Sequence, residues 1–228
     1  MQARDRLIVA ADLSTRDEVL RLADELSGVA GVIKIGLQAF VANGPSLARD
    51  VVSRGHRVFL DLKLHDIPNT VGAAVREVEK LGVSMLTVHA PGSEAMLRAA
   101  NSASILVLAV TVLTSLTDDD LQRIGVRHST SQSAASLALL ARDSGIRGVV
   151  ASPLEITGIR EACGGDMTIV TPGIRPSGSS AGDQQRTMTP AEAIRAGADY
   201  IVVGRPITGS TNRRDAAQAI VDEMERAG

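Results

Sequence analysis

The stretch FLDLKLHDIPNT, at residues 59–70, begins as an apolar strand and ends in charged side chains. Residues i and i+2 of a strand point to the same side, so Asp61 and Lys63 share one face and the neighbouring leucines share the other. Removing charged groups from water is costly. A strand that ends in this way is therefore typical of a fold that gathers polar groups at its strand ends.

Seven other segments have the same apolar, β-branched composition and are predicted strands. They are RLIVAADL (6–13), GVIKIG (31–36), MLTVHA (85–90), SILVLAVTVL (104–113), GVVASP (148–153), TIVTPGI (168–174) and YIVVGRPI (200–207). Segments with helical spacing lie between them, including TRDEVLRLADEL (15–26), NTVGAAVREVEKLG (69–82), SQSAASLALLARDSG (131–145) and TPAEAIRAGA (189–198). Several open on Ser, Thr or Asn caps and close at Gly, as helices do.

Strands that alternate with amphipathic helices indicate the α/β class, with a parallel sheet covered by helices. Eight such units fit a closed (β/α)8 barrel, formed as a single domain by residues 1–228. A Rossmann-like open sheet is the alternative, although no GxGxxG motif follows the first strand.

The composition narrows the functional classes. The formal net charge of −2 offers no basic field for nucleic acid, and with no Trp, one Tyr and two Phe the chain lacks aromatic platforms for bases. Cys163 is the single cysteine, so no internal disulfide is expected. The N-terminal apolar run is too short for a signal peptide, and residues 105–113 fall below the roughly 18 needed to span a membrane. We expect a cytoplasmic protein without nucleic-acid or membrane partners.

In a barrel of this kind the chemistry takes place at the carboxyl ends of the strands. Polar residues recur at those positions: Asp12, Lys34, Asp61, Lys63, His89, Thr111, Thr114, Arg175 and Arg205. A lysine held between carboxylates keeps its proton and can act as a cation and proton donor. A salt-bridge network that merely closes the barrel is the alternative, but buried ion pairs stabilise poorly, which favours a functional role.

Other strand-end residues allow two interpretations each. His89 is more typical of a hydrogen-bonded packing residue than of a metal ligand, because the four histidines show no paired ligand spacing. Gly204 and Arg205 follow the eighth strand, where many barrels bind phosphate, although Arg205 could also be an ordinary surface residue. The Gly- and Ser-rich segment RPSGSSAGDQQR, at residues 175–186, suits a mobile lid.

Taken together, and in this order along the chain, VIKIG, FLDLKLHDIPNT, TVLTS, VTPGIR, DQQR and VVGR resemble the orotidine 5'-monophosphate decarboxylase family, whose members make UMP in pyrimidine synthesis. The resemblance covers essentially the whole chain. The DxKxxD pattern alone is shared with 3-keto-L-gulonate 6-phosphate decarboxylase and hexulose phosphate synthase. The DIPNT continuation and the TPGIR and DQ pair select the orotidine branch.

The resemblance implies a cofactor-free carboxy-lyase with no metal, in which Lys63 is the general acid. Lys34, Asp61, Lys63 and Asp66 would form an alternating charged array. The other implied substrate contacts are Asp12 and Lys34 at the ribose, Thr114 at the pyrimidine, Gln184, Gly204 and Arg205 at the phosphate, and Arg175 at the root of the lid.

The resemblance also implies a homodimer, in which Asp66, Ile67 and Thr70 reach the partner's site. The chain departs from the family at Pro91 and Ser93, where relatives tend to have small residues or glycine. Neither position is one of the matched catalytic residues.

Two rival functions stay open. A metal-dependent sugar-phosphate decarboxylase or aldolase would use Mg2+ at the DxKxxD carboxylates to stabilise an enediolate, and would be sensitive to chelators. A catalytically silent nucleotide-binding barrel would bind UMP without turning over orotidine 5'-monophosphate. The complete set of Lys34, Asp61, Lys63 and Asp66 is evidence against a silent barrel.

Overall fold

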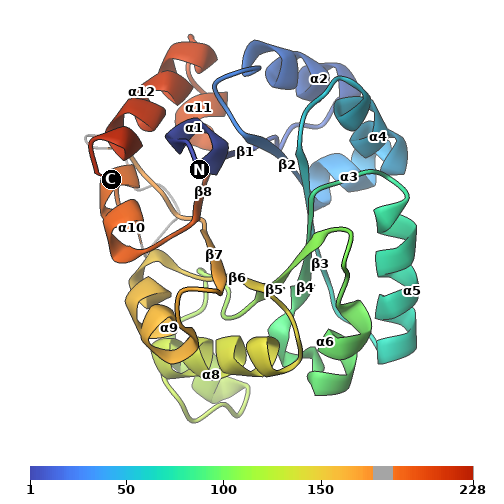
Figure 1. Cartoon of the computed structure of the whole chain (residues 1–228), viewed down its shortest axis with the longest axis vertical. Coiled ribbons are helices and arrows are strands. Elements are labelled where there is room, and N and C mark those ends of the chain that lie inside the picture. Colours follow the sequence, from blue (N-terminus) through green and yellow to red (C-terminus); the bar gives the residue numbers. More distant parts are fainter. Residues whose placement is uncertain (177–186, 228) are drawn as a thin grey trace.

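The computed structural model describes residues 1–176 and 187–227. In it, eight parallel strands close into a barrel in the order of the sequence (Figure 1). The strands are β1 (Leu7–Ala10), β2 (Val32–Gly36), β3 (Val58–Leu64), β4 (Met85–His89), β5 (Leu106–Val110), β6 (Gly148–Val150), β7 (Thr168–Thr171) and β8 (Tyr200–Val203). The predicted (β/α)8 barrel is confirmed, and the open-sheet alternative is wrong because β1 pairs with β8.

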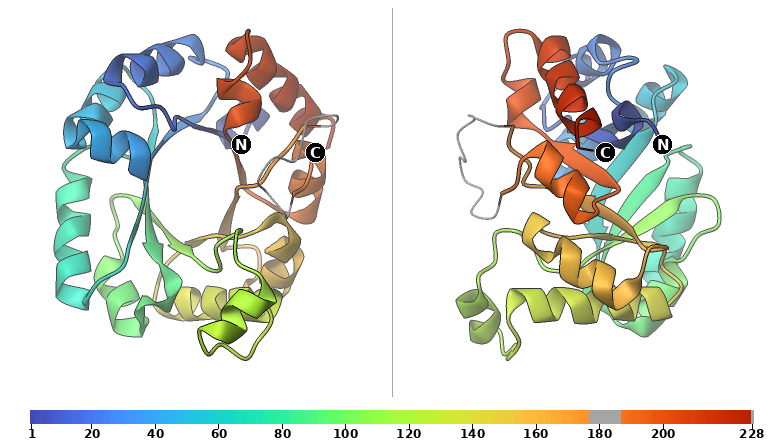
Figure 2. Two further views of the ribbon diagram at one scale, coloured as in Figure 1. Left: turned by 180° about the vertical axis from the view of Figure 1, so that it is seen from behind. Right: turned by 60° about the vertical axis from the view of Figure 1, so that its left-hand side comes forward.

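A ring of helices surrounds the barrel, as the view from behind and the side view show (Figure 2). They are α1 (Ala3–Arg6), α2 (Arg16–Glu25), α3 (Leu37–Asn43), α4 (Pro45–Ser53), α5 (Pro68–Glu79), α6 (Glu94–Ala100), α7 (Asp118–Arg123), α8 (Thr130–Asp143), α9 (Ile156–Cys163), α10 (Pro190–Ala196), α11 (Arg205–Thr208) and α12 (Arg213–Glu225). Short 3-10 turns, η1 (Ala90–Gly92) and η2 (Pro153–Glu155), precede α6 and α9. Some connections between consecutive strands therefore contain two helices where the sequence pattern predicted one.

The helix boundaries follow the capping chemistry of the sequence. Thr15, Ser129 and Thr189 each form a capping box with the residue three positions later, which satisfies backbone N–H groups that lack a partner within the helix. The predicted opening of a helix at Asn69 is wrong. That helix, α5, begins at Pro68 without a side-chain cap. Proline suits the first helical position, because its φ is fixed near the helical value and it has no N–H group to leave without a partner.

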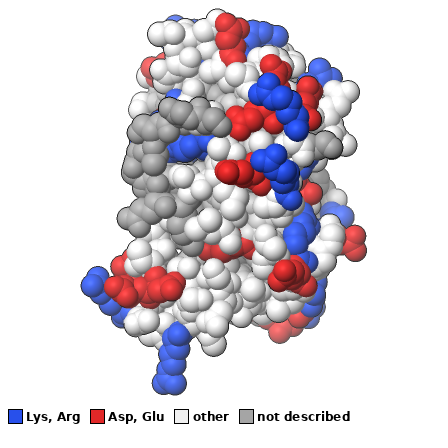
Figure 3. Space-filling model, turned by 90° about the vertical axis from the view of Figure 1, so that its left-hand side faces the viewer, with Lys and Arg blue, Asp and Glu red and all other residues white. Residues whose placement is uncertain are grey.

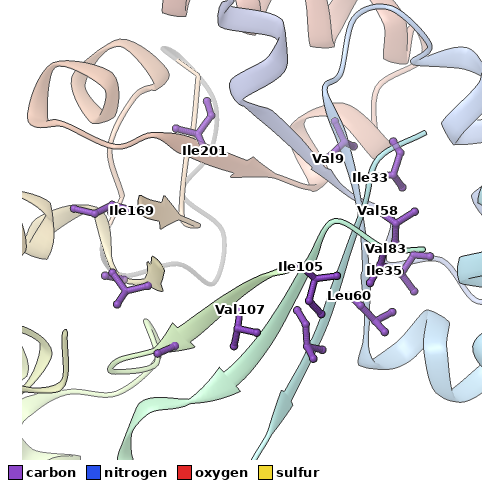
Figure 4. Close-up of a cluster of buried hydrophobic side chains, with 14 of the residues drawn as sticks. Val9, Ile33, Ile35, Val58, Leu60, Val83, Ile105, Val107, Ile169 and Ile201 are labelled. Atoms are coloured by element: carbon purple, nitrogen blue, oxygen red, sulfur yellow. The ribbon is translucent and has the colours of Figure 1, made fainter. Parts of the chain in front are cut away.

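Two hydrophobic cores result from the alternation of side chains along the strands. The inner core fills the barrel and contains Ile8, Val32, Phe59, Met85, Leu108, Val170 and Val202. The outer core lies between the barrel and the helices, and Figure 4 labels members of it that include Val9, Ile33, Leu60, Val107 and Ile201. The barrel interior is thus a packed platform beneath the carboxyl ends of the strands.

The surface carries charges of both signs. On the face shown in Figure 3, acidic and basic side chains are interspersed rather than gathered by sign.

Cys163 is a buried free thiol in α9, and burial raises its pKa, as expected for an inert residue. Within the described ranges, no helix has the length and apolar character needed to cross a membrane.

Candidate active site

A cavity of about 460 Å³ opens at the carboxyl ends of the strands. This volume lies in the usual range for small-molecule sites. Apolar residues of the strands, among them Phe59 and Val202, belong to its lining. Eight of the predicted site residues also line it: Asp12, Lys34, Asp61, Lys63, Thr114, Arg175, Gly204 and Arg205. The barrel thus brings together residues separated by almost 200 positions in the chain.

Four charged side chains form a continuous alternating chain in the mouth of the barrel. Lys34 Nζ lies 3.1 Å from Asp12 Oδ1 and 3.5 Å from Asp61 Oδ2. Lys63 Nζ lies 2.8 Å from the other oxygen of that carboxylate, Asp61 Oδ1. Lys34 is buried, whereas Lys63 keeps 28% of its side chain exposed. The order Asp12, Lys34, Asp61, Lys63 therefore ends in an ammonium group that is accessible from the cavity.

The charge on Asp61 results from opposing effects. Burial by itself would raise the pKa of this carboxyl group. The ammonium groups of Lys34 and Lys63, with hydrogen bonds from Lys63 and Thr87, outweigh burial and hold the pKa below its ordinary value. Asp61 therefore stays a carboxylate at neutral pH and holds two lysines beside it.

The backbone of β3 is irregular where the array begins. Leu60 pairs with Leu86 and Leu64 with Val88, so three residues of β3 stand opposite the single residue Thr87 of β4. Within this bulge Lys63 adopts a φ of 53°, which is uncommon outside glycine. Lys63 nevertheless still points toward Asp61, as the alternation of the strand predicted.

Gly36 is a residue of the site that the sequence reasoning missed. A Cβ atom at this position would lie 2.8 Å from Asp12 Oδ1 and 2.9 Å from Lys34 Nζ. The lack of a side chain at the end of β2 therefore leaves room for the ion pair. The signal in the sequence was a glycine two positions after Lys34, on the same face of the strand.

Two arginines also line the cavity. Arg175 follows β7 and Arg205 follows β8, and both line the pocket together with the backbone of Gly204. Arg175 Nη1 donates a hydrogen bond to Ile174 O at 2.8 Å. Burial, and then the charge of Arg205, lower the pKa of Arg175. Two guanidinium groups that line one cavity are an arrangement suited to a bound anion.

The remaining predicted residues lie elsewhere. Asp66, Ile67 and Thr70 are exposed, and in the described part of a single chain they do not line the cavity. Asp66 Oδ1 accepts a hydrogen bond from the N–H of Ile67 at 2.6 Å. Gln184, together with residues 177–186 of the expected lid, lies outside the described residues.

His89 lies at the end of β4 beside His65, with 5.5 Å between the ring centroids. Burial lowers the pKa of His89, and electrostatic interactions with His65 and Lys63 lower it further. Thr111 donates its hydroxyl proton to Val150 O at 3.1 Å. Over residues 1–176 and 187–227, no group of three or more His, Cys, Asp or Glu side chains is arranged to hold a metal ion.

Comparisons with known proteins agree with this arrangement. The family model described as "Orotidine 5'-phosphate decarboxylase / HUMPS family" matches residues 5–220. The orotidine 5'-phosphate decarboxylase of Moorella thermoacetica is 51% identical, over 99% of this chain and 94% of its own length. The orotidine 5'-phosphate decarboxylase of Heliobacterium modesticaldum is 48% identical, over 98% of this chain and 97% of its own length.

A solved structure shows the same likeness in three dimensions. The crystal structure of orotidine 5'-phosphate decarboxylase from Lactobacillus acidophilus superposes with a TM-score of 0.85 at 36% identity, covering 96% of this chain and 98% of that one. With a family model that matches residues 5–220 and relatives of about 50% identity, the chain belongs to the orotidine 5'-phosphate decarboxylase / HUMPS family.

Proposed function

We propose that this chain decarboxylates orotidine 5'-monophosphate to UMP in de novo pyrimidine biosynthesis. The observation that carries the proposal is the alternating chain of Asp12, Lys34, Asp61 and Lys63 in the barrel mouth. Relatives with almost complete coverage that are named orotidine 5'-phosphate decarboxylase support it.

In the proposed reaction, the bond between C6 of the pyrimidine and its carboxylate breaks, and the electron pair stays on C6. The Lys63 ammonium stabilises this carbanion and then donates a proton to C6. Lysine regains its proton from water. Asp61 holds Lys63 in place at 2.8 Å and, close to the departing carboxylate, raises the free energy of the bound substrate.

Binding contacts far from C6 contribute to the rate. Arg205, Arg175 and the Gly204 backbone would hold the 5'-phosphate, with Gln184 as a further contact. Asp12 and Lys34 would contact the ribose, and Thr114 the pyrimidine. Binding energy from these groups orders the substrate against the charged array.

The direct test is the ultraviolet absorbance change when the purified protein is mixed with orotidine 5'-monophosphate in excess EDTA. We expect conversion to UMP under these conditions. A lack of turnover, with activity on sugar phosphates after Mg2+ is restored, would support the metal-dependent branch of the family. Binding of UMP without any turnover would support a silent nucleotide-binding barrel.

We also propose that the active unit is a homodimer, in which Asp66, Ile67 and Thr70 complete the partner's site. Ile67 is 67% exposed, and Asp66 and Thr70 are exposed beside it. An aspartate beyond Lys63, supplied by a second chain, would extend the alternation of charges. The segment follows β3 directly, so it starts at the mouth of the barrel.

Mixing two inactive variants tests this sharing of residues. Lys63→Ala and Asp66→Ala homodimers, when exchanged, would form heterodimers with one intact site, and activity would return. The control mixture of Lys63→Ala with Asp61→Ala stays inactive, because both residues belong to the same chain's array. Equal behaviour of the two mixtures would contradict shared sites.

A further inference from the structure

Thr87 is fully buried at the centre of β4, although it lies between the apolar residues Leu86 and Val88. Leu86 and Val88 belong to the outer core, so the strand alternation turns Thr87 toward the barrel interior. It is not one of the described residues that line the cavity. A polar side chain in this place needs hydrogen-bond partners.

The partners of Thr87 are Asp61 and Lys63, which are neighbours in the charged array. Its hydroxyl donates to Asp61 Oδ1 at 2.9 Å and accepts from the backbone N–H of Lys63 at 2.9 Å. One hydroxyl group thus binds both residues whose side chains meet at 2.8 Å.

The geometry of β3 explains why a side chain is needed here. Three residues of β3 face Thr87 alone, and a ladder of backbone hydrogen bonds cannot continue regularly across such a bulge. The Thr87 hydroxyl provides an acceptor for the Lys63 N–H inside the irregular segment. It also supports the left-handed backbone of Lys63, with its φ of 53°, which would otherwise be free to relax.

We infer that Thr87 is a positioning residue for the decarboxylation, which holds the Asp61 carboxylate and the Lys63 backbone in the geometry required for proton delivery. This inference rests on the proposed function. Thr87 acts through Asp61 and Lys63 and does not touch the substrate, so its loss affects the chemical step more than substrate binding.

The experiment compares Thr87→Ser with Thr87→Ala, since these variants differ only in the hydroxyl group. We expect kcat of the Ala variant to be on the order of 10- to 100-fold below that of the Ser variant, with similar KM. The isosteric Thr87→Val variant should lose kcat in the same way.

Thr171 provides the matched control. It is equally buried, and its hydroxyl donates to Ala151 O at 2.7 Å, away from the array. Thr171→Ser and Thr171→Ala should have equal kcat. Thermal unfolding of all variants shows which losses follow from stability alone.

The pH profile provides a second readout that a purely structural role would not change. The hydrogen bond from Thr87 is one of the effects that lower the pKa of Asp61, so its removal should move the acidic limb of kcat to higher pH. Thr87→Ser should leave that limb in place.

The outcomes separate the two proposals. If the wild-type chain does not turn over orotidine 5'-monophosphate, the proposed function fails and the inference fails with it. If the wild type is active but Thr87→Ser and Thr87→Ala have equal kcat and equal pH profiles, the role of Thr87 alone is overturned.

Discussion

At the scale of single residues, the charged array depends on space as much as on charge. Gly36 is the last residue of β2. Because it has no Cβ atom, Asp12 Oδ1 and Lys34 Nζ can occupy the space beside it. Both atoms are the ends of side chains, which can move aside. A side chain at position 36 would therefore separate the ion pair without disturbing the packed core.

We predict that Gly36→Ala lowers kcat/KM on the order of tenfold or more, while the free energy of unfolding changes by less than about 1 kcal/mol. Steady-state kinetics and urea unfolding measure the two effects. Gly158→Ala in α9 is the control, because a Cβ there meets no atom within 4 Å. A loss of stability as large as the loss of activity would contradict the prediction, because it would show that the methyl group disturbs the packed core and not the ion pair alone.

The lowered pKa of Asp61 predicts how stability depends on pH. A carboxyl group whose pKa is lowered by folding stabilises the native state above its ordinary pKa, and this contribution disappears as the pH falls through the lowered value. The unfolding free energy of the wild type minus that of Asp61→Asn should therefore be constant above about pH 5. Below about pH 4 this difference should fall, because the wild type loses the contribution of the Asp61 carboxylate. Urea unfolding between pH 6 and pH 3 measures this difference, and a constant value throughout would contradict the prediction.

At the scale of elements, the start of α6 is strained. Ser93 has a φ of 90° and a ψ of 157°, in a region of backbone space that is almost restricted to glycine. Its hydroxyl accepts a hydrogen bond from the N–H of Met96, which partly offsets this cost. The departure from the family pattern at Ser93, noted from the sequence, thus falls on a position where the backbone favours glycine.

We predict that Ser93→Gly stabilises the protein by about 1 kcal/mol, because relief of backbone strain exceeds the loss of the cap. Chemical denaturation measures the change. Ser129→Gly is the matched control, since Ser129 also caps a helix but has an ordinary φ of −62°. That variant should lose a few tenths of a kcal/mol. If both variants were destabilised, strain at Ser93 would be ruled out.

At the scale of the whole molecule, the barrel joins two functional regions that no single element contains. The charged array comes from β2, β3 and the segment after β1, whereas the two guanidinium groups follow β7 and β8. Closure of the barrel through the β1 and β8 pair places these regions around one cavity. Binding energy gained at one region can therefore order the chemistry at the other.

We predict that Arg205→Ala lowers kcat/KM by about 30- to 150-fold, the equivalent of a charge-assisted contact of roughly 2 to 3 kcal/mol. Kinetics with orotidine 5'-monophosphate provide the measurement. Arg123→Ala is the control, because the Arg123 side chain is 80% exposed on α7, away from the cavity lining. An unchanged kcat/KM for Arg205→Ala would place the phosphate elsewhere.

Much of this molecule follows from the sequence alone. The eight apolar segments predicted the strands, because burial on both faces of a parallel sheet requires continuous apolar runs. The alternation in FLDLKLHDIPNT placed Asp61 and Lys63 on one face, and the strand-end positions predicted the charged residues that line the cavity. Local periodicity and position along a strand were sufficient for these conclusions.

Only the tertiary structure decided the rest, because the remaining features depend on contacts between strands. The bulge in β3, the left-handed backbone of Lys63 and the two hydrogen bonds of Thr87 arise from the register between β3 and β4, which no local pattern encodes. The requirement for glycine at position 36 arises in the same way, from the side chains of Asp12 and Lys34 meeting across β1 and β2. The sequence determined which residues meet at the mouth of the barrel, and the packing of neighbouring strands determined how they are held there.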